Sequence, residues 1–309
     1  MTRLHGALQR ATEGKAQIIP PEAGTGTSQG VDPSQTAFSV PWTLDAQAPA
    51  VTAEEPSAPR PGFSHARVNH FGSFPREAAE KLVTAAAPDE PAALAVAIEQ
   101  YRKLAATLHH AQGDRGLKLI MVTSANPGEG KSLTASNLAL TLSESYQRRV
   151  LLIDADLRRP SLHDILGVPN GTGLSDGLAR DSIEGLGVVE VSPRLSVLPS
   201  GRPMEDPTGS LTSSQMRRIL DEAKAAYDWA IIDTPPIGML TDAKLLAEMV
   251  DGVVLVVEAE KTPYPDLLRA IDTIGRERVL GAVLNRLRHV PGSAYYYASY
   301  YRGSRELKA

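Results

Sequence analysis

A glycine-rich loop at residues 124–132 is the part of this chain best suited to bind phosphate. It reads Ser-Ala-Asn-Pro-Gly-Glu-Gly-Lys-Ser and lies between the apolar run 119–122 and a helix-forming stretch. Where a strand enters such a loop and a helix leaves it, backbone N–H groups and the positive helix end converge on phosphate oxygens. Lys131 would reach the β- and γ-phosphates, and the Ser132 hydroxyl would ligate Mg²⁺. One departure is that Ala125 replaces the first glycine of the usual spacing.

Carboxylates follow two further apolar runs, as a bound metal would require. Asp154 and Asp156 come after the run 150–153, and Asp233 ends the run 229–232 before two prolines. In a parallel sheet these strand ends reach the same edge as the phosphate loop. Mg²⁺ needs further oxygen ligands, and a nucleophilic hydroxyl needs a proton acceptor. Asp154 and Asp156 can divide these roles, and the sequence leaves the division open.

These positions predict an Mg²⁺-ATP site with catalytic and metal-binding side chains. The catalytic candidates are Lys131, Asp154 and Asp156, and the metal candidates are Ser132, Asp154, Asp156 and Asp233. The residues expected to contact the nucleotide are Asn126, Pro127, Gly128, Glu129, Gly130, Lys131, Ser132, Leu133 and Asn285.

The elements that would position these residues alternate between strand and helix. After a helix from Pro91 that ends before Gly113, strands are expected at about 117–123, 149–154, 195–199, 229–233, 252–258 and 279–285. Helices are expected at about 131–147, 209–226, 240–249 and 263–275. This order predicts an α/β fold of the phosphate-loop (SIMIBI-like) type, with a mainly parallel sheet covered by helices on both faces. Near-continuous apolar strands such as 253–257 fit a sheet buried on both sides.

Composition divides the chain into three parts. Residues 1–88 hold ten of the 23 prolines and predict a disordered arm, with one possible short helix at the N-terminus. Residues 89–285 form the expected nucleotide-binding domain, and residues 286–309 a basic tail. The net charge of −4, the lack of cysteine and the lack of a long apolar run predict a cytoplasmic protein without disulfides or its own membrane span.

The tail is unusually rich in tyrosine. Five of the nine tyrosines lie within seven residues, and they are Tyr295, Tyr296, Tyr297, Tyr300 and Tyr301. An aromatic patch for stacking on nucleic acid or for self-association is one interpretation. A set of phosphate acceptors is the other.

Together, Pro127 to Ser132, the Asp154-Ala155-Asp156-Leu157-Arg158 motif and the Ile232-Asp233-Thr234-Pro235-Pro236 motif resemble those of bacterial protein-tyrosine kinases of capsule and exopolysaccharide assembly. The resemblance implies an ATP-dependent autokinase that phosphorylates the tail tyrosines of neighbouring subunits in a homo-oligomer. It also implies a membrane-embedded polysaccharide chain-length regulator and a cognate tyrosine phosphatase as partners. Through that regulator, the chain would lie at the inner face of the plasma membrane.

Other interpretations stay open on the sequence alone. A partition or division-site ATPase of the same fold would use nucleotide only to drive assembly, although such proteins carry a signature lysine where this chain has Asn126. A silent ATP-binding adaptor and nucleic-acid binding through the basic tail are further alternatives. The Glu-x-x-Arg-x-x-Arg self-association pattern of the resembled family is matched by Glu99 and Arg102, but the third position is Ala105.

Overall fold

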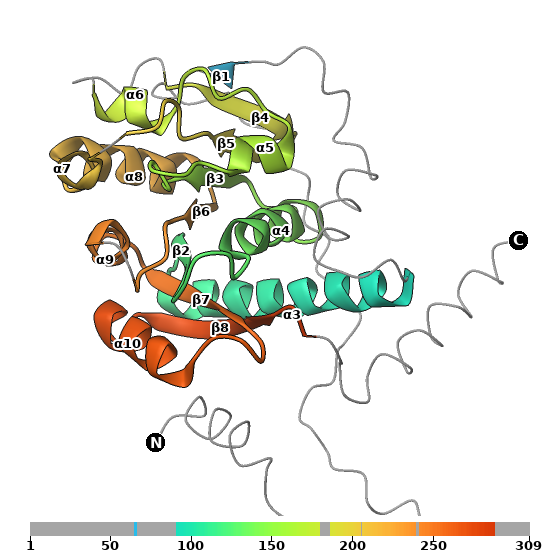
Figure 1. Cartoon of the computed structure of the whole chain (residues 1–309). Coiled ribbons are helices and arrows are strands. Elements are labelled where there is room, and N and C mark those ends of the chain that lie inside the picture. Colours follow the sequence, from blue (N-terminus) through green and yellow to red (C-terminus); the bar gives the residue numbers. More distant parts are fainter. Residues whose placement is uncertain (1–64, 67–90, 180–185, 205, 239–240, 288–309) are drawn as a thin grey trace, which may run out of the picture. The chain divides into compact units, whose positions relative to one another are not determined.

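The computed structural model describes residues 65–66, 91–179, 186–204, 206–238 and 241–287. All of them belong to one of the two compact units of the chain, Pro59–Ala309. This unit is built around a single sheet with helices on either side (Figure 1).

The sheet has eight strands in the order β1-β4-β5-β3-β6-β2-β7-β8. Their bounds are β1 His65–Ala66, β2 Leu119–Ser124, β3 Val150–Asp154, β4 Val188–Ser192, β5 Leu195–Leu198, β6 Trp229–Asp233, β7 Gly252–Glu258 and β8 Val279–Asn285. All neighbouring strands are parallel except β4 and β5, which form an antiparallel pair. The predicted α/β fold with a mainly parallel sheet is therefore confirmed.

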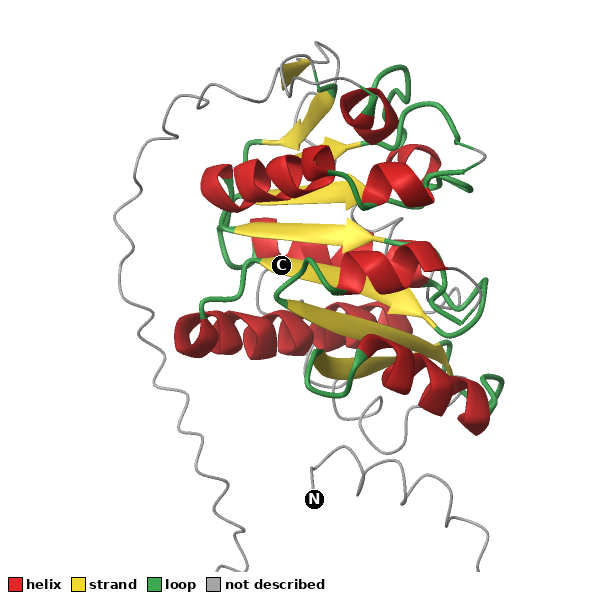
Figure 2. Cartoon of the chain, turned by 90° about the vertical axis from the view of Figure 1, so that its left-hand side faces the viewer, coloured by secondary structure: helices red, strands yellow, loops and turns green. Residues whose placement is uncertain are grey.

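Helices cover both faces of this sheet. The bounds are α3 Pro91–Arg115, α4 Lys131–Glu144, α5 Leu162–Leu166, α6 Leu174–Leu178, α7 Thr208–Leu211, α8 Ser214–Ala226, α9 Thr241–Ala247 and α10 Tyr264–Ile274. Helices α3, α4 and α5 lie on one face, and α8, α9 and α10 lie on the other (Figures 1 and 2). The first group encloses the main apolar core together with the strands.

The central strands are apolar on both faces and are buried along their whole length. Every residue of β2, β3 and β6 is buried, as expected for strands with helices on either side. In the pairing of β3 with β6, Asp154 lies directly opposite Asp233. Val122 of β2 also lies opposite Asp233. The two acidic strand ends and the loop that follows β2 therefore meet at one edge of the sheet.

Some predicted boundaries were wrong. Helix α3 continues through Gly113 and ends before Gly116, which has a left-handed φ of 67° and donates its N–H to the Gln112 carbonyl at 2.8 Å. The helix predicted at 209–226 is split into α7 and α8, because Ser213 caps a new start by accepting the Met216 N–H at 3.2 Å.

Four short elements were missed, namely the helices α5 and α6 and the strands β1 and β4. Strand β1, which pairs with β4, falls within the predicted arm 1–88. Most of that arm lies outside the described residues, as do the tail residues from 288 onward. The division at 88 and 286 therefore stays a prediction.

Candidate active site

The phosphate-binding loop connects β2 to α4, which begins at Lys131. Gly128 and Gly130 have positive φ angles of 80° and 92°, which residues with a β-carbon rarely adopt. A Cβ atom on Gly130 would also lie 2.1 Å from the side-chain nitrogen of Asn285. The first N–H groups of a helix have no partner inside the helix, so the start of α4 presents free donors to an anion.

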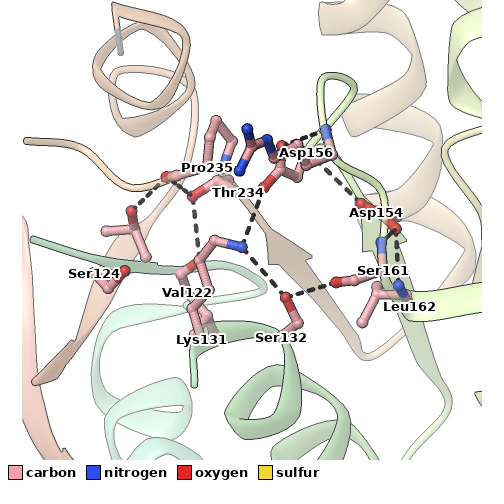
Figure 3. Close-up of polar contacts among 12 residues, drawn as sticks. Val122, Ser124, Lys131, Ser132, Asp154, Asp156, Ser161, Leu162, Thr234 and Pro235 are labelled. Atoms are coloured by element: carbon pink, nitrogen blue, oxygen red, sulfur yellow. Dashed lines mark hydrogen bonds and ion pairs between the residues drawn. The ribbon is translucent and has the colours of Figure 1, made fainter. Parts of the chain in front are cut away.

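The side chain of Lys131, at the end of this loop, is paired with a carboxylate from the segment that follows β3. Its Nζ lies 3.1 Å from Oδ2 of Asp156 and donates to the Ser132 hydroxyl at 3.3 Å (Figure 3). Burial alone would lower the pKa of Lys131, but the Asp233 and Asp156 carboxylates outweigh it and the pKa is raised. The ammonium group is therefore charged at neutral pH and available to a phosphate.

Asp154 is fully buried and is occupied by main-chain donors. Its Oδ2 accepts the N–H groups of Ser161 at 3.1 Å and Leu162 at 3.0 Å, and its Oδ1 accepts that of Asp156 at 3.2 Å. Burial raises the pKa of Asp154 to about 6, and these hydrogen bonds oppose the rise. Asp156 differs, because only its Oδ1 accepts a main-chain N–H, from Arg159 at 3.1 Å.

Asp233 is the carboxylate in this cluster whose bonding capacity is unused. It is fully buried, and neither oxygen has a hydrogen-bond partner among the residues that the structure describes. Burial raises its pKa to about 7, against the opposing charge of Lys131. An orphaned buried carboxylate is costly unless a cation or a donor arrives.

This arrangement fits a Mg²⁺ ion that arrives with phosphate. Within the described ranges, no three His, Asp or Glu side chains converge into a cage that could hold a metal without help. Mg²⁺ commonly uses one or two protein oxygens and takes the rest from phosphates and water. Ser132, Asp233 and the acidic pair can supply such a partial set.

Ser161 is a residue at this site that the sequence analysis missed. Its hydroxyl donates to the Ser132 hydroxyl at 2.9 Å (Figure 3). The two residues are 29 positions apart, and Ser161 has no flanking pattern beyond its place after the Asp154 motif. Only the fold brings it to the loop.

Two of the residues predicted to contact nucleotide direct their side chains to other parts of the protein. Glu129 is buried, and its carboxylate accepts the Asn126 N–H at 3.1 Å and the Thr262 hydroxyl. The Asn126 side chain donates to Asp266 of α10 at 3.1 Å. Any contact of Glu129 with nucleotide therefore comes from its main chain, and its side chain fixes the shape of the loop.

The remaining predicted positions divide into three groups. Pro127 and Gly128 are exposed at the tip of the loop, while the Leu133 side chain packs against the core and leaves only its main chain for a ligand. Asn285, at the end of β8, donates to the Glu129 carbonyl at 2.9 Å and so borders the loop, and its contact with nucleotide stays a prediction. The acceptor candidates Tyr295, Tyr296, Tyr297, Tyr300 and Tyr301 lie outside the described residues.

The partial Glu-x-x-Arg-x-x-Arg pattern lies on α3. Arg102 lies 3.6 Å from Glu99 on the exposed part of the helix. Ala105 is completely buried in the core shared with α4. The third position of the pattern therefore has no place for a charged side chain in this packing.

Comparison with known proteins agrees with the geometry. A family model described as an AAA domain matches residues 117–278, which is more than half of the chain. This places the fold and the loop within a class of nucleotide-binding proteins.

The relatives are more specific. The tyrosine-protein kinase YwqD of Bacillus subtilis is 39% identical over 202 residues, which cover 64% of this chain and 85% of YwqD. The kinase domain of the Escherichia coli tyrosine kinase ETK is 30% identical with a TM-score of 0.59, covering 63% of this chain and 78% of that one. The succinoglycan biosynthesis transport protein ExoP of Rhizobium meliloti is 35% identical over 176 residues, covering 55% of this chain but only 22% of ExoP.

The chain therefore belongs to the family of bacterial tyrosine-protein kinases. This confirms the family that the three motifs predicted.

Proposed function

We propose that this protein is an Mg²⁺-ATP-dependent protein-tyrosine autokinase whose substrates are the tail tyrosines of neighbouring subunits. The observation that carries the proposal is the Lys131 ammonium held by Asp156 beside Ser132 and the unpartnered Asp233. A phosphate group entering the loop would meet a charged lysine, helix N–H donors and an incomplete set of metal ligands. Family membership supports phosphoryl transfer to tyrosine as the reaction.

In the proposed reaction, the tyrosine oxygen attacks the γ-phosphorus of ATP. A new P–O bond forms, the bond to the oxygen bridging the β- and γ-phosphorus atoms breaks, and ADP leaves. Lys131 and the first N–H groups of α4 stabilise charge on the transferring group. Mg²⁺, when bound, would neutralise charge on the phosphates. Ser132 and Asp233 would hold it, with Asp154 and Asp156 nearby.

We assign the proton acceptor to Asp156. Both oxygens of Asp154 already accept main-chain N–H groups, and these bonds hold the loop at 155–162 in shape. The Oδ2 atom of Asp156 is paired with Lys131. If Lys131 turns to the phosphates, this oxygen is released at the moment when the tyrosine hydroxyl needs an acceptor.

The biological setting is proposed from the family and the relatives. ExoP is a succinoglycan biosynthesis transport protein, which supports a role in polysaccharide synthesis and export. Of the described helices, none is long and apolar enough to cross a membrane. We propose a membrane-embedded chain-length regulator as the partner that recruits the kinase to the inner face of the plasma membrane, and a cognate phosphatase that reverses the modification.

Phosphotyrosine formation on the purified full-length chain tests the function. Wild type should incorporate phosphate with Mg²⁺-ATP and lose incorporation when Mg²⁺ is chelated. Lys131→Met should lower incorporation by about two orders of magnitude or more while the variant still melts as a folded protein. Replacement of the five tail tyrosines by Phe should remove most self-labelling but leave phosphorylation of a supplied tail peptide. Near-normal labelling of Lys131→Met would refute the assignment.

A further inference from the structure

We infer that Ser161 is a positioning residue for the metal site, because its hydroxyl fixes the direction in which Ser132 presents a lone pair to the cation. The inference rests on the proposed Mg²⁺-nucleotide function and adds a residue to it. Ser161 follows the Asp154 motif and lies at the start of α5. Its contact with the phosphate-binding loop is the side-chain hydrogen bond to Ser132.

The hydroxyl of Ser161 does not cap the helix that it precedes. Serine at the position before a helix usually accepts a main-chain N–H from the first turn. Ser161 occupies that position for α5, but its side chain makes no such capping bond. The Asp154 carboxylate takes over that role by accepting the N–H groups of Ser161 and Leu162. The Ser161 hydroxyl is thereby available to Ser132.

The bonding capacity of Ser132 shows what this contact does. A serine hydroxyl has two acceptor positions and one donor. In the structure it accepts from Ser161 at 2.9 Å and from Lys131 at 3.3 Å (Figure 3). When Lys131 turns to phosphate, one acceptor position becomes available for a cation. Ser161 keeps the other occupied and so limits the rotation of the hydroxyl about its C–O bond.

Ser161 also connects the two halves of the site. Its main-chain N–H binds Asp154 and its side chain binds Ser132, so one residue fixes the distance between the acidic loop and the phosphate-binding loop. Replacing the side chain removes the second contact but leaves the first. The two roles can therefore be separated by mutation.

The test is the Mg²⁺ dependence of nucleotide binding to full-length Ser161→Ala. A fluorescent ADP analogue is titrated with chelator present, and Mg²⁺ is then titrated into the complex. We expect nucleotide affinity without metal to stay within about twofold of wild type. The apparent affinity for Mg²⁺ should fall about three- to tenfold, the effect of losing one hydrogen bond that orients a ligand. The Mg²⁺ requirement of autophosphorylation should rise in parallel.

Two variants control for packing and chemistry. Ser161→Thr keeps the hydroxyl and should restore the Mg²⁺ dependence. Ser143→Ala removes a buried serine hydroxyl of α4 that donates to the Leu140 carbonyl at 2.9 Å, away from the site, and should leave it unchanged. If Ser161→Ala does not fold, the same Mg²⁺ titration is made on Ser161→Cys. Its thiol is a weak donor, so its Mg²⁺ affinity should also fall.

Two outcomes would overturn the inference. One is an unchanged Mg²⁺ affinity in folded Ser161→Ala. Another is an equal loss of metal-free nucleotide affinity and melting temperature, which would mean a general structural role. Binding is measured without catalysis. The role of Ser161 in Mg²⁺ binding can therefore be judged even if the protein proves not to be a kinase.

Discussion

Asp233→Asn should stabilise the ligand-free protein at alkaline pH although it disables the site. Asp233 is fully buried, and neither of its oxygens has a hydrogen-bond partner within the described part of the chain. Burial raises the pKa of this carboxyl from 3.8 to about 7. The folded protein therefore favours the protonated form, and ionisation opposes folding. Asparagine is close in shape and does not ionise.

The raised pKa fixes both the sign and the size of the effect. Between pH 4 and 7 the folded state binds more protons at Asp233 than the unfolded state does, so stability falls as pH rises through this window. Each pH unit costs about 1.4 kcal/mol. From pH 5 to pH 8 the wild type should lose on the order of 2–3 kcal/mol at this group. For a domain of this size that corresponds to roughly 5–10 °C in melting temperature.

Thermal melting of both proteins at pH 5 and pH 8, without nucleotide or metal, measures the difference. The advantage of Asp233→Asn should grow with pH, and Asp154 titrates in both proteins, so most of its contribution cancels. Mg²⁺-ADP should raise the melting temperature of wild type and have little effect on the variant. A melting difference that is the same at both pH values would refute the reasoning.

Asp251→Asn is the matched control, because it should behave in the opposite way. Asp251 accepts the main-chain N–H groups of Lys118 at 2.8 Å and Leu119 at 2.9 Å, and Lys224 donates to it at 2.8 Å. Burial would raise its pKa, but these donors outweigh it and the pKa is lowered. Its stabilisation is present above the unfolded pKa and is lost as pH falls through the folded one. The variant should therefore be less stable than wild type, by a constant amount, from pH 5 to 8.

Two further predictions concern the site, and a third concerns the tail. Thr262→Val should leave an oxygen of the buried Glu129 without its donor and weaken nucleotide binding about tenfold by calorimetry, whereas Thr273→Val on the exposed side of α10 should not. Asp156→Asn should lower the rate of peptide phosphorylation with a smaller loss of melting temperature than Asp154→Asn, because Asp156 accepts one main-chain N–H and Asp154 accepts three; a near-normal rate in folded Asp156→Asn would move the proton acceptor to Asp154. Phosphorylation of the tail 286–309, whose five basic residues outnumber one acid, should shift the protein to smaller species in sedimentation, and identical size distributions at low salt would contradict this.

The central part of the fold could be predicted from the sequence because buried parallel strands consist of consecutive apolar residues. Strands β3, β6 and β7 are such runs, and each was placed within a residue or two. Parallel strands end at one edge, so the meeting of the Asp154 motif with Asp233 also followed from order alone. Strand β4 was missed because it is placed by an antiparallel hairpin with β5 and only part of it is buried, so it does not appear as an apolar run.

The supporting residues of the site could not be predicted in the same way. Ser161, Thr262 and Asp266 are single polar residues in loops or at a helix start, with partners 29, 133 and 140 positions away. No local periodicity marks such contacts. The departure at Ala125 is explained by the backbone, because Ala125 is not among the described residues with a positive φ and so needs no glycine there.

The two ends of the parallel strands differ in what their aspartates do: one end carries a stabilising aspartate, and the other carries the candidate site. At the edge where β2 and β7 begin, Asp251 is satisfied by three donors, its pKa is lowered, and its charge helps to hold the strands together. At the edge where β2 and β6 end, Asp233 has no such donors and its pKa is raised. The same side chain type therefore stabilises one edge and destabilises the other. A bound cation with phosphate would supply what Asp233 lacks, so ligand binding and folding stability should rise together at the second edge only.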